Sequence, residues 1–314
     1  MSSTPATGSF VVSESLAGST LAAAVRELLG GLSWSAAKAL CAAGRVRVDG
    51  QTARDPAQRL TAGANLSVGA EGQREERSLL VHVDEAIAVV DKPPGLLTTP
   101  VEARDRDTLI QRAAAAVRKQ DAHRGRRGSP SLRAVQRLDR DTSGLLVFAR
   151  TVLAQRGLQD QLKGRTVLRL YLALVHGRAN DATYETHLLE DRGDGIRGSW
   201  ERLRKPGPPP VLARTAITHV QVMRRFADAT LVACRLETGR QHQIRIHLSE
   251  AGHPLLGEPV YVRGSRLAAA RDRAPRVMLH AAELGFTPPI TGQQLAFAVE
   301  PPPDFAAVVR SLAD

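Results

Sequence analysis

A break in the hydrophobic pattern near residue 70 most constrains how this chain of 314 residues can fold. Residues 70–77 are polar and charged, and no apolar periodicity runs through them. Because such a stretch cannot be buried in a core, we interpret it as a linker between two domains. We expect a small domain at residues 16–70 and a larger one at residues 79–310, each with its own hydrophobic core.

The small domain begins with the pattern of two short helices. Thr20 can cap a helix that stops at Gly30, and Ser33 can open a second helix that ends near Gly44. Apolar residues recur at helical spacing within the first of these segments.

A basic hairpin follows the two helices. Residues 45–48 alternate as a strand, a turn is expected at 49–50, and a closing strand is expected at 65–68. This order of elements resembles the S-four-like RNA-binding domain, and the alternative is an unrelated α+β module with a solvated basic edge. The resemblance implies that the basic residues of this domain contact RNA, namely Lys38, Arg45 and Arg47.

Strands outnumber helices in the larger domain. They are expected where the sequence is apolar or alternating, at residues 87–90, 145–149, 167–175, 216–222 and 230–236. Several of these look antiparallel, so we expect an α+β domain on a mixed, mainly antiparallel sheet. The glycine-rich, charged segments 117–131 and 191–210 are expected to be mobile insertions.

The excess of basic over acidic residues indicates which class of molecule this protein binds. The formal net charge is +11. Such a surface attracts a polyanion, either a nucleic acid or an acidic membrane, although arginine-rich composition also follows genome bias. We expect a nucleic acid. Met1–Phe10 does not resemble a targeting segment and no apolar run reaches membrane-spanning length, so we expect a cytoplasmic protein without membrane association.

The most informative loop is residues 136–144, which leads directly into the apolar strand at 145–149. Its Asp, Thr, Ser and Gly residues favour turns held by side-chain bonds to the backbone, so it can present a carboxylate beside arginines. Asp139 and Asp141 are both candidates for a nucleophile or base. Taken alone, the same pattern is also typical of an ion-pair loop at the surface.

Two further segments contain candidate site residues. In residues 167–175, leucines alternate with Arg169, Tyr171 and Ala173, so Tyr171 is either directed at a cleft or a half-buried sheet tyrosine. Residues 241–251 fit both strand and helix spacing. Their two histidines are poorly spaced for a shared metal ion and have no carboxylate partner, so we expect no metal site.

These motifs, taken in order, resemble the RluA-type pseudouridine synthases. The match extends over most of residues 79–305 and includes four groups of residues. They are Asp91-Lys92-Pro93-Pro94-Gly95, Arg137-Leu138-Asp139 with Thr142-Ser143-Gly144, the run from Thr238 to Arg245 with Gly252-His253-Pro254, and the late residues Leu279-His280-Ala281 with Pro301 to Phe305. Three positions depart from the family pattern: Gln136 replaces the usual His, Arg169 a common Lys, and Glu258 the usual Asp.

The resemblance implies isomerisation of uridine to pseudouridine in structured RNA. It selects Asp139 as the catalytic nucleophile or base, Tyr171 as the active-site tyrosine, and Arg245 as the residue, on a helix, that aligns Asp139. RNA contacts are then expected from Arg137, Arg240, His242 and Lys92. The reaction needs no cofactor, and the sequence has no nucleotide-binding glycine loop or redox cysteine pair.

Ribosomal RNA is the preferred partner and transfer RNA the second possibility, with no obligate protein partner implied. The alternative function is a non-catalytic RNA-binding or ribosome-assembly protein on the same fold, which Gln136 would favour. A metal-dependent nuclease fits less well, because no set of carboxylates is clustered for metal ions.

Overall fold

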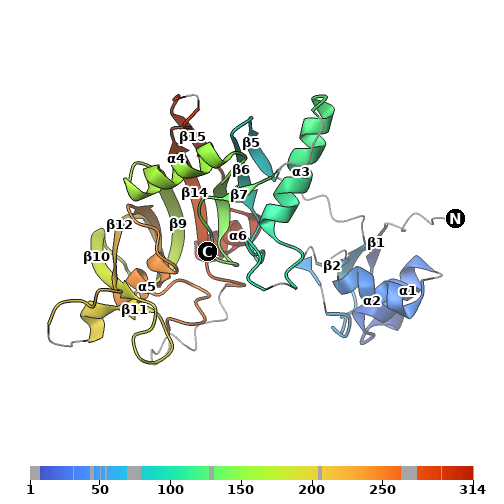
Figure 1. Cartoon of the computed structure of the whole chain (residues 1–314). Helices are drawn as coiled ribbons and strands as arrows, with labels where there is room; N and C mark the ends of the chain where they lie inside the picture. Colours follow the sequence, from blue (N-terminus) through green and yellow to red (C-terminus); the bar gives the residue numbers. More distant parts are fainter. Residues whose placement is uncertain are drawn as a thin grey trace. The chain divides into compact units, whose positions relative to one another are not determined.

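The computed structural model divides into two compact units, residues 1–77 and 78–314 (Figure 1). It describes residues 8–30, 32–42, 46–49, 51–53, 55–68, 79–102, 104–126, 131–203, 207–262, 274–290 and 292–313. The expected linker at 70–77 and the expected RNA-binding residue Arg45 lie outside these ranges. Within the described ranges, no helix is both long enough and apolar enough to cross a membrane.

Unit 1 is a four-stranded antiparallel sheet with two helices, and its strand order is β1-β4-β2-β3. Thr20 and Ser33 cap the two helices as expected, because their hydroxyls accept hydrogen bonds from the backbone of Ala23 and Ala36, at 3.3 and 3.2 Å. The elements are β1 (Gly8–Val11), η1 (Glu14–Leu16), α1 (Leu21–Leu29), α2 (Trp34–Ala42), β2 (Val46–Val48), β3 (Gln51–Thr52) and β4 (Asn65–Val68).

Unit 1 has its own core. The core joins the buried faces of α1 and α2 to β2 and β4, and all of its members lie between residues 10 and 68. The other core clusters contain only residues of unit 2. The two units therefore bury separate sets of apolar side chains.

Unit 2 is built on a long mixed sheet with the strand order β11-β10-β12-β13-β9-β14-β8-β6-β5, while β15 pairs with β14 and β7 with β8. Its strands are β5 (Leu80–Val83), β6 (Ile87–Lys92), β7 (Arg133–Ala134), β8 (Ser143–Ala149), β9 (Leu168–His176), β10 (Ala182–Leu189), β11 (Gly198–Ser199), β12 (Arg214–Arg225), β13 (Ala229–Leu236), β14 (Leu279–Phe286) and β15 (Leu295–Ala298). In the described sheet only β14 and β8 pair in parallel, which confirms the expected α+β class with a mainly antiparallel sheet.

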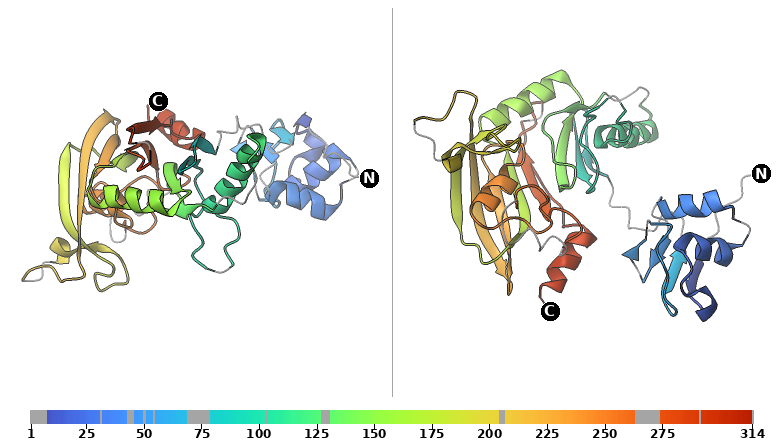
Figure 2. Two further views of the ribbon diagram at one scale, coloured as in Figure 1. Left: turned by 45° about the horizontal axis from the view of Figure 1, so that its top comes forward. Right: turned by 90° about the horizontal axis from the view of Figure 1, so that it is seen from below.

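Helices cover different parts of this sheet (Figures 1 and 2). Helix α3 (Leu109–His123) packs on β5 and β6, α4 (Val152–Lys163) on β7 and β8, and α5 (Gln243–Glu250) on β12. The 3-10 helix η2 (Trp200–Leu203) follows β11, and α6 (Pro303–Ser311) contributes Phe305 and Val308 to a core cluster with Leu174 of β9. Residues 243–250 are therefore helical, as the family resemblance implied.

Three expectations about unit 2 are wrong in part. Residues 117–123 are not an insertion but the last turns of α3, because Val117 is buried against the sheet. Residues 191–203 include β11 and η2, so they are not an unstructured loop. Strand β9 is buried on both faces rather than one: Tyr171 belongs to the largest core cluster, Leu174 belongs to another, and Leu168 at the strand's start is 39% exposed.

The close approach of β8 and β14 depends on Gly144. Its φ is +107°, and a Cβ on it would lie 2.1 Å from the carbonyl oxygen of Ala281 on β14. Ala281 in turn pairs with Tyr171 of β9. The strand after the 136–144 loop and the strand bearing Tyr171 are thus brought together at a position where only glycine fits.

We predict that Gly144→Ala destabilises unit 2 by roughly 3 kcal/mol or more, because an unfavourable φ is added to a steric overlap with backbone. Gly193→Ala is the matched control, since Gly193 has a similar φ of +111° but open space around its Cβ position. Urea unfolding of both variants measures the difference. Equal losses in the two variants would contradict the proposed close approach.

Candidate active site

A pocket of about 820 Å³ opens in unit 2 and contains most of the expected site residues. Its wall is formed by the 136–142 loop, the start of β9, the segment after β13 and the first turn of α5. The charged or titratable lining residues are mostly cationic: Arg137, Asp139, Arg140, Asp141, Lys163, Arg165, Arg169, Tyr171, Glu237, Arg240, His242 and Arg245.

Side chains from outside the loop bind its backbone and hold it in place. The Thr98 hydroxyl donates to the carbonyl of Leu138 at 2.9 Å and accepts from its amide at 3.1 Å. Lys92 is fully buried, and its ammonium donates to the carbonyls of Pro93, Arg140 and Thr142 at 3.0, 2.7 and 2.8 Å. The loop's buried carbonyls thus have partners although they lie outside regular secondary structure.

Arg276 adds a third anchor from the segment before β14. Its guanidinium donates to the carbonyl of Asp141 at 2.9 Å and to the Ser143 hydroxyl at 3.3 Å. Asp304, in the first turn of α6, accepts from Arg276 at 2.7 and 3.2 Å, so the charge of this arginine is neutralised. The C-terminal helix is therefore linked to the loop that presents Asp139.

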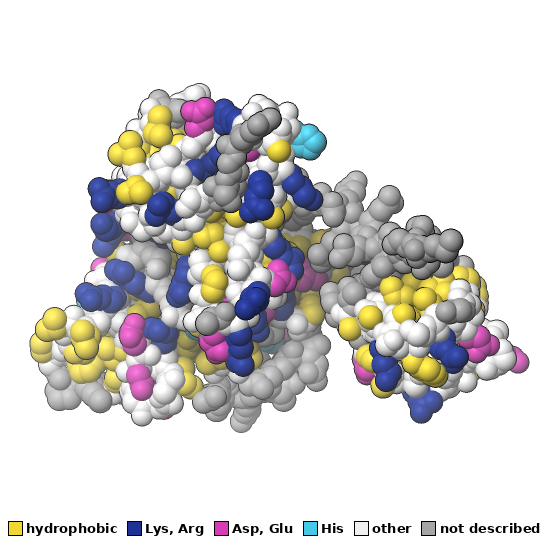
Figure 3. All heavy atoms as spheres, turned by 45° about the vertical axis from the view of Figure 1, so that its right-hand side comes forward, with side chains coloured by type: hydrophobic (Ala, Val, Ile, Leu, Met, Phe, Trp, Pro, Cys, Tyr) yellow, Lys and Arg dark blue, Asp and Glu magenta, His cyan; other side chains and the backbone are white. Residues whose placement is uncertain are grey.

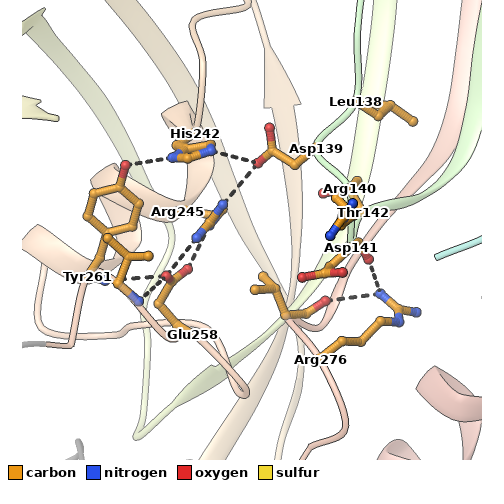
Figure 4. A network of polar contacts seen from close by, with 12 residues as sticks. Leu138, Asp139, Arg140, Asp141, Thr142, His242, Arg245, Glu258, Tyr261 and Arg276 are labelled. Atoms are coloured by element: carbon orange, nitrogen blue, oxygen red, sulfur yellow. Dashed lines mark hydrogen bonds and ion pairs between the residues drawn. The ribbon is translucent and has the colours of Figure 1, made fainter. Parts of the chain in front are cut away.

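Asp139 lies at one end of a chain of alternating charges (Figure 4). Arg245 on α5 donates from Nη1 to its Oδ2 at 3.2 Å, and donates from Nε and Nη2 to the carboxylate of Glu258 at 2.7 and 2.8 Å. Burial opposes the charge on Arg245, but its bonds to Glu258 and the charge of Asp139 raise its pKa above the ordinary value. Arg245 therefore stays charged and cannot rotate freely beneath Asp139.

His242 and Tyr261 complete the surroundings of this ion pair. The Nε2 of His242 lies 3.7 Å from Oδ2 of Asp139, and its Nδ1 lies 2.7 Å from the hydroxyl of Tyr261. Burial is the main cause that lowers the pKa of His242. The negative charge of Asp139 opposes this shift, and the positive charge of Arg245 reinforces it. Burial raises the pKa of Tyr261 to about 12, and this tyrosine's ring lies against the guanidinium of Arg245.

Tyr171 lines the same pocket from β9, although its side chain is only 8% exposed. Burial raises its pKa, the charge of Arg169 acts in the opposite direction, and Asp139 adds to the increase. At neutral pH it is therefore an un-ionised phenol on an apolar strand, with a ring available at the pocket wall.

The structure brings six of the expected site residues together in one pocket, and others lie elsewhere. Asp139, Tyr171 and Arg245 line one pocket together with the expected RNA-binding residues Arg137, Arg240 and His242. In unit 1, Lys38 is exposed on α2 and Arg47 is half-buried on β2.

The expectation that Lys92 contacts RNA is wrong. Its side chain is 0% exposed, and its three ammonium hydrogens are accounted for by the three backbone carbonyls. Burial lowers its pKa to about 7, a shift that Asp141 opposes and Arg276 reinforces. Lys92 is a structural support of the loop and not part of a binding surface.

Sequence reasoning missed Thr98, Tyr261 and Arg276. Thr98 and Tyr261 are single polar residues in loops, and no local spacing distinguishes them from surface residues. Arg276 lies four residues before His280 of a recognised motif, which was the one available signal. The described residues contain no group of three or more His, Cys, Asp or Glu side chains placed to hold a metal ion.

Comparison with solved structures identifies the class of fold. The chain is similar to the structure titled human RNA pseudouridylate synthase domain containing 4, with a TM-score of 0.59 and 21% identity over 74% of this chain and 92% of that one. At this level of identity the likeness concerns the fold, which is that of a pseudouridine synthase.

Sequence comparison then gives the family. The family model described as RNA pseudouridylate synthase matches residues 86–250, and the S4 domain model matches residues 20–66. The chain is 33% identical to ribosomal large subunit pseudouridine synthase D of Zymomonas mobilis over 96% of both proteins. It is 39% identical to the protein of that name from Nitrosomonas europaea over 73% of this chain and 63% of that protein. The chain belongs to the RNA pseudouridylate synthase family.

We predict that Glu258→Gln lowers the free energy of unfolding by roughly 3 kcal/mol, because it leaves the buried Arg245 with a weaker partner. The rate constant of isomerisation should fall with little change in RNA affinity, since Arg245 is then less firmly held beneath Asp139. Glu85→Gln removes a surface partner of Arg126 that is 81% exposed and should change stability by less than about 0.5 kcal/mol. A Glu258→Gln variant as stable and active as Glu85→Gln would refute this role.

Proposed function

We propose that this enzyme isomerises uridine in large-subunit ribosomal RNA and uses Asp139 as its catalytic carboxylate. Family membership supports the reaction, and the printed names of the relatives from Zymomonas mobilis and Nitrosomonas europaea support the substrate. An enzyme acting on ribosomal RNA would work in the cytoplasm.

The observation that carries the proposal is the placement of Asp139. Its carboxylate lies in a pocket large enough for a flipped nucleotide, on a loop whose backbone is bound by Lys92, Thr98 and Arg276. Arg245 contacts it from one side and is itself locked by Glu258. A carboxylate held in this way reaches a bound substrate with little loss of orientation.

Two routes use the same carboxylate. The reaction breaks the bond from N1 to C1′, turns the base, joins C5 to C1′, and moves a proton from C5 to N1, so no atom is gained or lost. Asp139 either attacks C1′ as a nucleophile or removes the 2′ proton to give a glycal. In both routes its anionic form is the reactive one, and Arg245 holds this carboxylate in place through a hydrogen bond of 3.2 Å.

The remaining pocket residues fit a flipped base and its phosphates. Tyr171 offers a ring face for stacking, and Arg137 is exposed beside Asp139, where it can fill the gap left by the base. Lysine and arginine side chains are spread over the face of unit 2 seen in Figure 3, with fewer acidic ones among them. Such a surface suits contacts with the phosphates of a structured RNA.

We assign the S4-like RNA-binding role to residues 16–70 and the catalytic role to residues 79–310. The match of residues 20–66 to the S4 domain model supports the first assignment. Exposed Lys38 and half-buried Arg47 are the described residues that would contact phosphates there.

Asp139→Asn should abolish isomerisation while RNA affinity stays within a few-fold of wild type, because phosphate contacts with arginine and lysine dominate binding. Asp141→Asn is the control: Asp141 lines the same pocket, but no ion pair connects its carboxylate to Arg245 among the residues described. Single-turnover rates and filter binding measure the two effects. An active Asp139→Asn variant, or an inactive Asp141→Asn variant beside it, would overturn the assignment.

The substrate is tested by pseudouridine maps of a deletion strain and its parent. Loss of sites in large-subunit ribosomal RNA, restored by wild type but not by Asp139→Asn, is the expected result. Loss confined to transfer RNA would show that the enzyme acts there instead.

Removal of residues 1–72 should leave a folded catalytic unit that binds long RNA more weakly. The core of unit 1 shares no residues with those of unit 2, so deletion exposes no interior of the remainder. Loss of Lys38 and Arg47 lowers the dependence of affinity on salt, since that slope follows the number of phosphates neutralised. The full chain and the chain without residues 1–72 are compared in two measurements: RNA affinity as a function of salt concentration, and the single-turnover rate at saturating RNA. An unchanged slope would contradict an RNA-binding role for unit 1.

A further inference from the structure

Arg169 is a buried arginine in the active-site wall, and no acidic residue among those described pairs with its charge. It lies on β9 two residues before Tyr171, its side chain faces the same pocket, and it is only 5% exposed. Burial lowers its pKa below the ordinary value, and the charge of Arg240 acts in the same direction while Tyr171 opposes it. A cation in this position destabilises the free protein unless something neutralises it.

The hydrogen bonds of Arg169 leave part of its guanidinium unused. Its Nη2 donates to the carbonyl oxygen of Glu237 at 2.8 Å, but its buried Nε has no hydrogen-bond partner. The carboxylate of Glu237 is engaged elsewhere, with Arg165 at 3.2 Å and His219 at 2.7 Å. Across the described part of the chain, no carboxylate forms an ion pair with Arg169.

Other arginines of unit 2 with little exposed side chain differ in this respect, namely Arg245, Arg276 and Arg150, whose side chains are 8%, 7% and 13% exposed. Arg245 pairs with Glu258, Arg276 pairs with Asp304, and Arg150 pairs with Asp121 at 2.5 Å. The fold therefore supplies an acid where an arginine serves only to hold the structure together. The lack of an acid at Arg169 points to an anion that is supplied from outside.

The chain leaves room for such an anion. Exposed Gly239 lies against the guanidinium of Arg169, and a Cβ on this residue would lie 2.5 Å from Nη1 of Arg169. Arg240 follows directly, is exposed, and lines the same pocket with its Nε on the carbonyl of Thr215 at 3.0 Å. Arg169 and Arg240 thus line one pocket, and the glycine between them in sequence has no side chain to cover the guanidinium of Arg169.

We propose that Arg169 and Arg240, with Gly239 between them, form a subsite for an RNA phosphate next to the uridine that Tyr171 receives. The phosphate's negative charge neutralises Arg169, and its oxygens accept the unused guanidinium hydrogens. A uracil carbonyl would accept hydrogen bonds but would leave the charge unbalanced, so phosphate fits the site better. This subsite rests on the proposed function, because it takes its phosphate from the RNA substrate.

The subsite is tested with three variants: Arg169→Met, which removes the charge, Arg169→Lys, which keeps it, and Arg235→Met as the matched control. Arg235 lies on the neighbouring strand β13, opposite Leu170, is exposed, and does not line the pocket. The substrates are fragments of the modified RNA that carry a single neutral methylphosphonate at each linkage flanking the target uridine in turn.

For wild type, one flanking methylphosphonate should lower kcat/KM roughly ten- to hundred-fold, the range expected for a charge-assisted hydrogen bond. Arg169→Met should show a similar loss on unmodified RNA and no further loss at that linkage, whereas Arg169→Lys should retain part of the rate. Arg235→Met should respond as wild type does. Additive losses for Arg169→Met at every linkage would overturn the proposal.

Thermal unfolding without RNA separates this role from a structural one. If Arg169 is a binding residue for an anion, Arg169→Met should have a Tm equal to or above that of wild type. A marked fall in Tm would show that Arg169 supports the fold instead. Titration with inorganic phosphate should raise the Tm of wild type more than that of Arg169→Met.

The methylphosphonate kinetics and the Tm measurements together also tell an RNA phosphate from a free phosphate. They separate a failure of this subsite from a failure of the proposed function. A phosphate-dependent Tm together with additive methylphosphonate losses would assign the site to a free anion and reject an RNA phosphate. If no RNA is isomerised at all, the proposed function fails, and the phosphate titration still decides whether Arg169 binds an anion.

Discussion

The active site depends on how the backbone carbonyls of residues 138–142 are hydrogen-bonded. These residues lie before strand β8. The carbonyl of Asp139 accepts from the amide of Thr142 within the loop, but the other four carbonyls are bound by side chains from three separate segments. These side chains are Lys92 from the end of β6, Thr98 from the following loop, and Arg276 from before β14. A buried carbonyl without a partner costs about 1–3 kcal/mol, so the loop is stable only when these segments have assembled. The position of Asp139 is thus a property of the whole sheet and not of its own loop.

A second constraint follows from placing an acid beside buried cations. Asp139 shares Arg245 with Glu258, whose side chain is fully buried and also accepts from the amides of Val260 and Tyr261 at 2.9 and 3.3 Å. Burial would raise the pKa of Glu258, but the bond to Arg245 and these amides hold it below its ordinary value. The replacement of the usual Asp by Glu at this position therefore keeps the charge and its bidentate contact, and this departure leaves the support of Asp139 intact.

The features that could be predicted from sequence were those set by local pattern. Helix α1 with its Thr20 cap, strand β4 and strand β9 were predicted nearly to the residue because periodicity and capping act over a few positions. Contacts between distant residues could not be read in this way: Arg245 lies 106 positions from Asp139, and Ser143 lies 137 positions from its partner His280. Asp139 was selected by family resemblance, whereas the residues alone also fitted a surface loop. Lys92 was misjudged because lysine is buried only when the fold supplies acceptors, and these come from residues about fifty positions away.

Two kinds of arginine lie in and around the pocket, and they differ in what neutralises them. Arg245 and Arg276 have carboxylates within the protein, lie at 8% and 7% side-chain exposure, and fix the geometry around Asp139. Arg137 and Arg240 line the same pocket, and among the described residues no acid pairs with either. The second kind contributes more to the attraction of a polyanion, since a charge already paired inside the protein has little field outside it. The placement of the positive charges therefore says more than the net charge of +11: internal pairs align Asp139, the catalytic carboxylate that we propose, and the unpaired arginines are left for the proposed contacts with RNA.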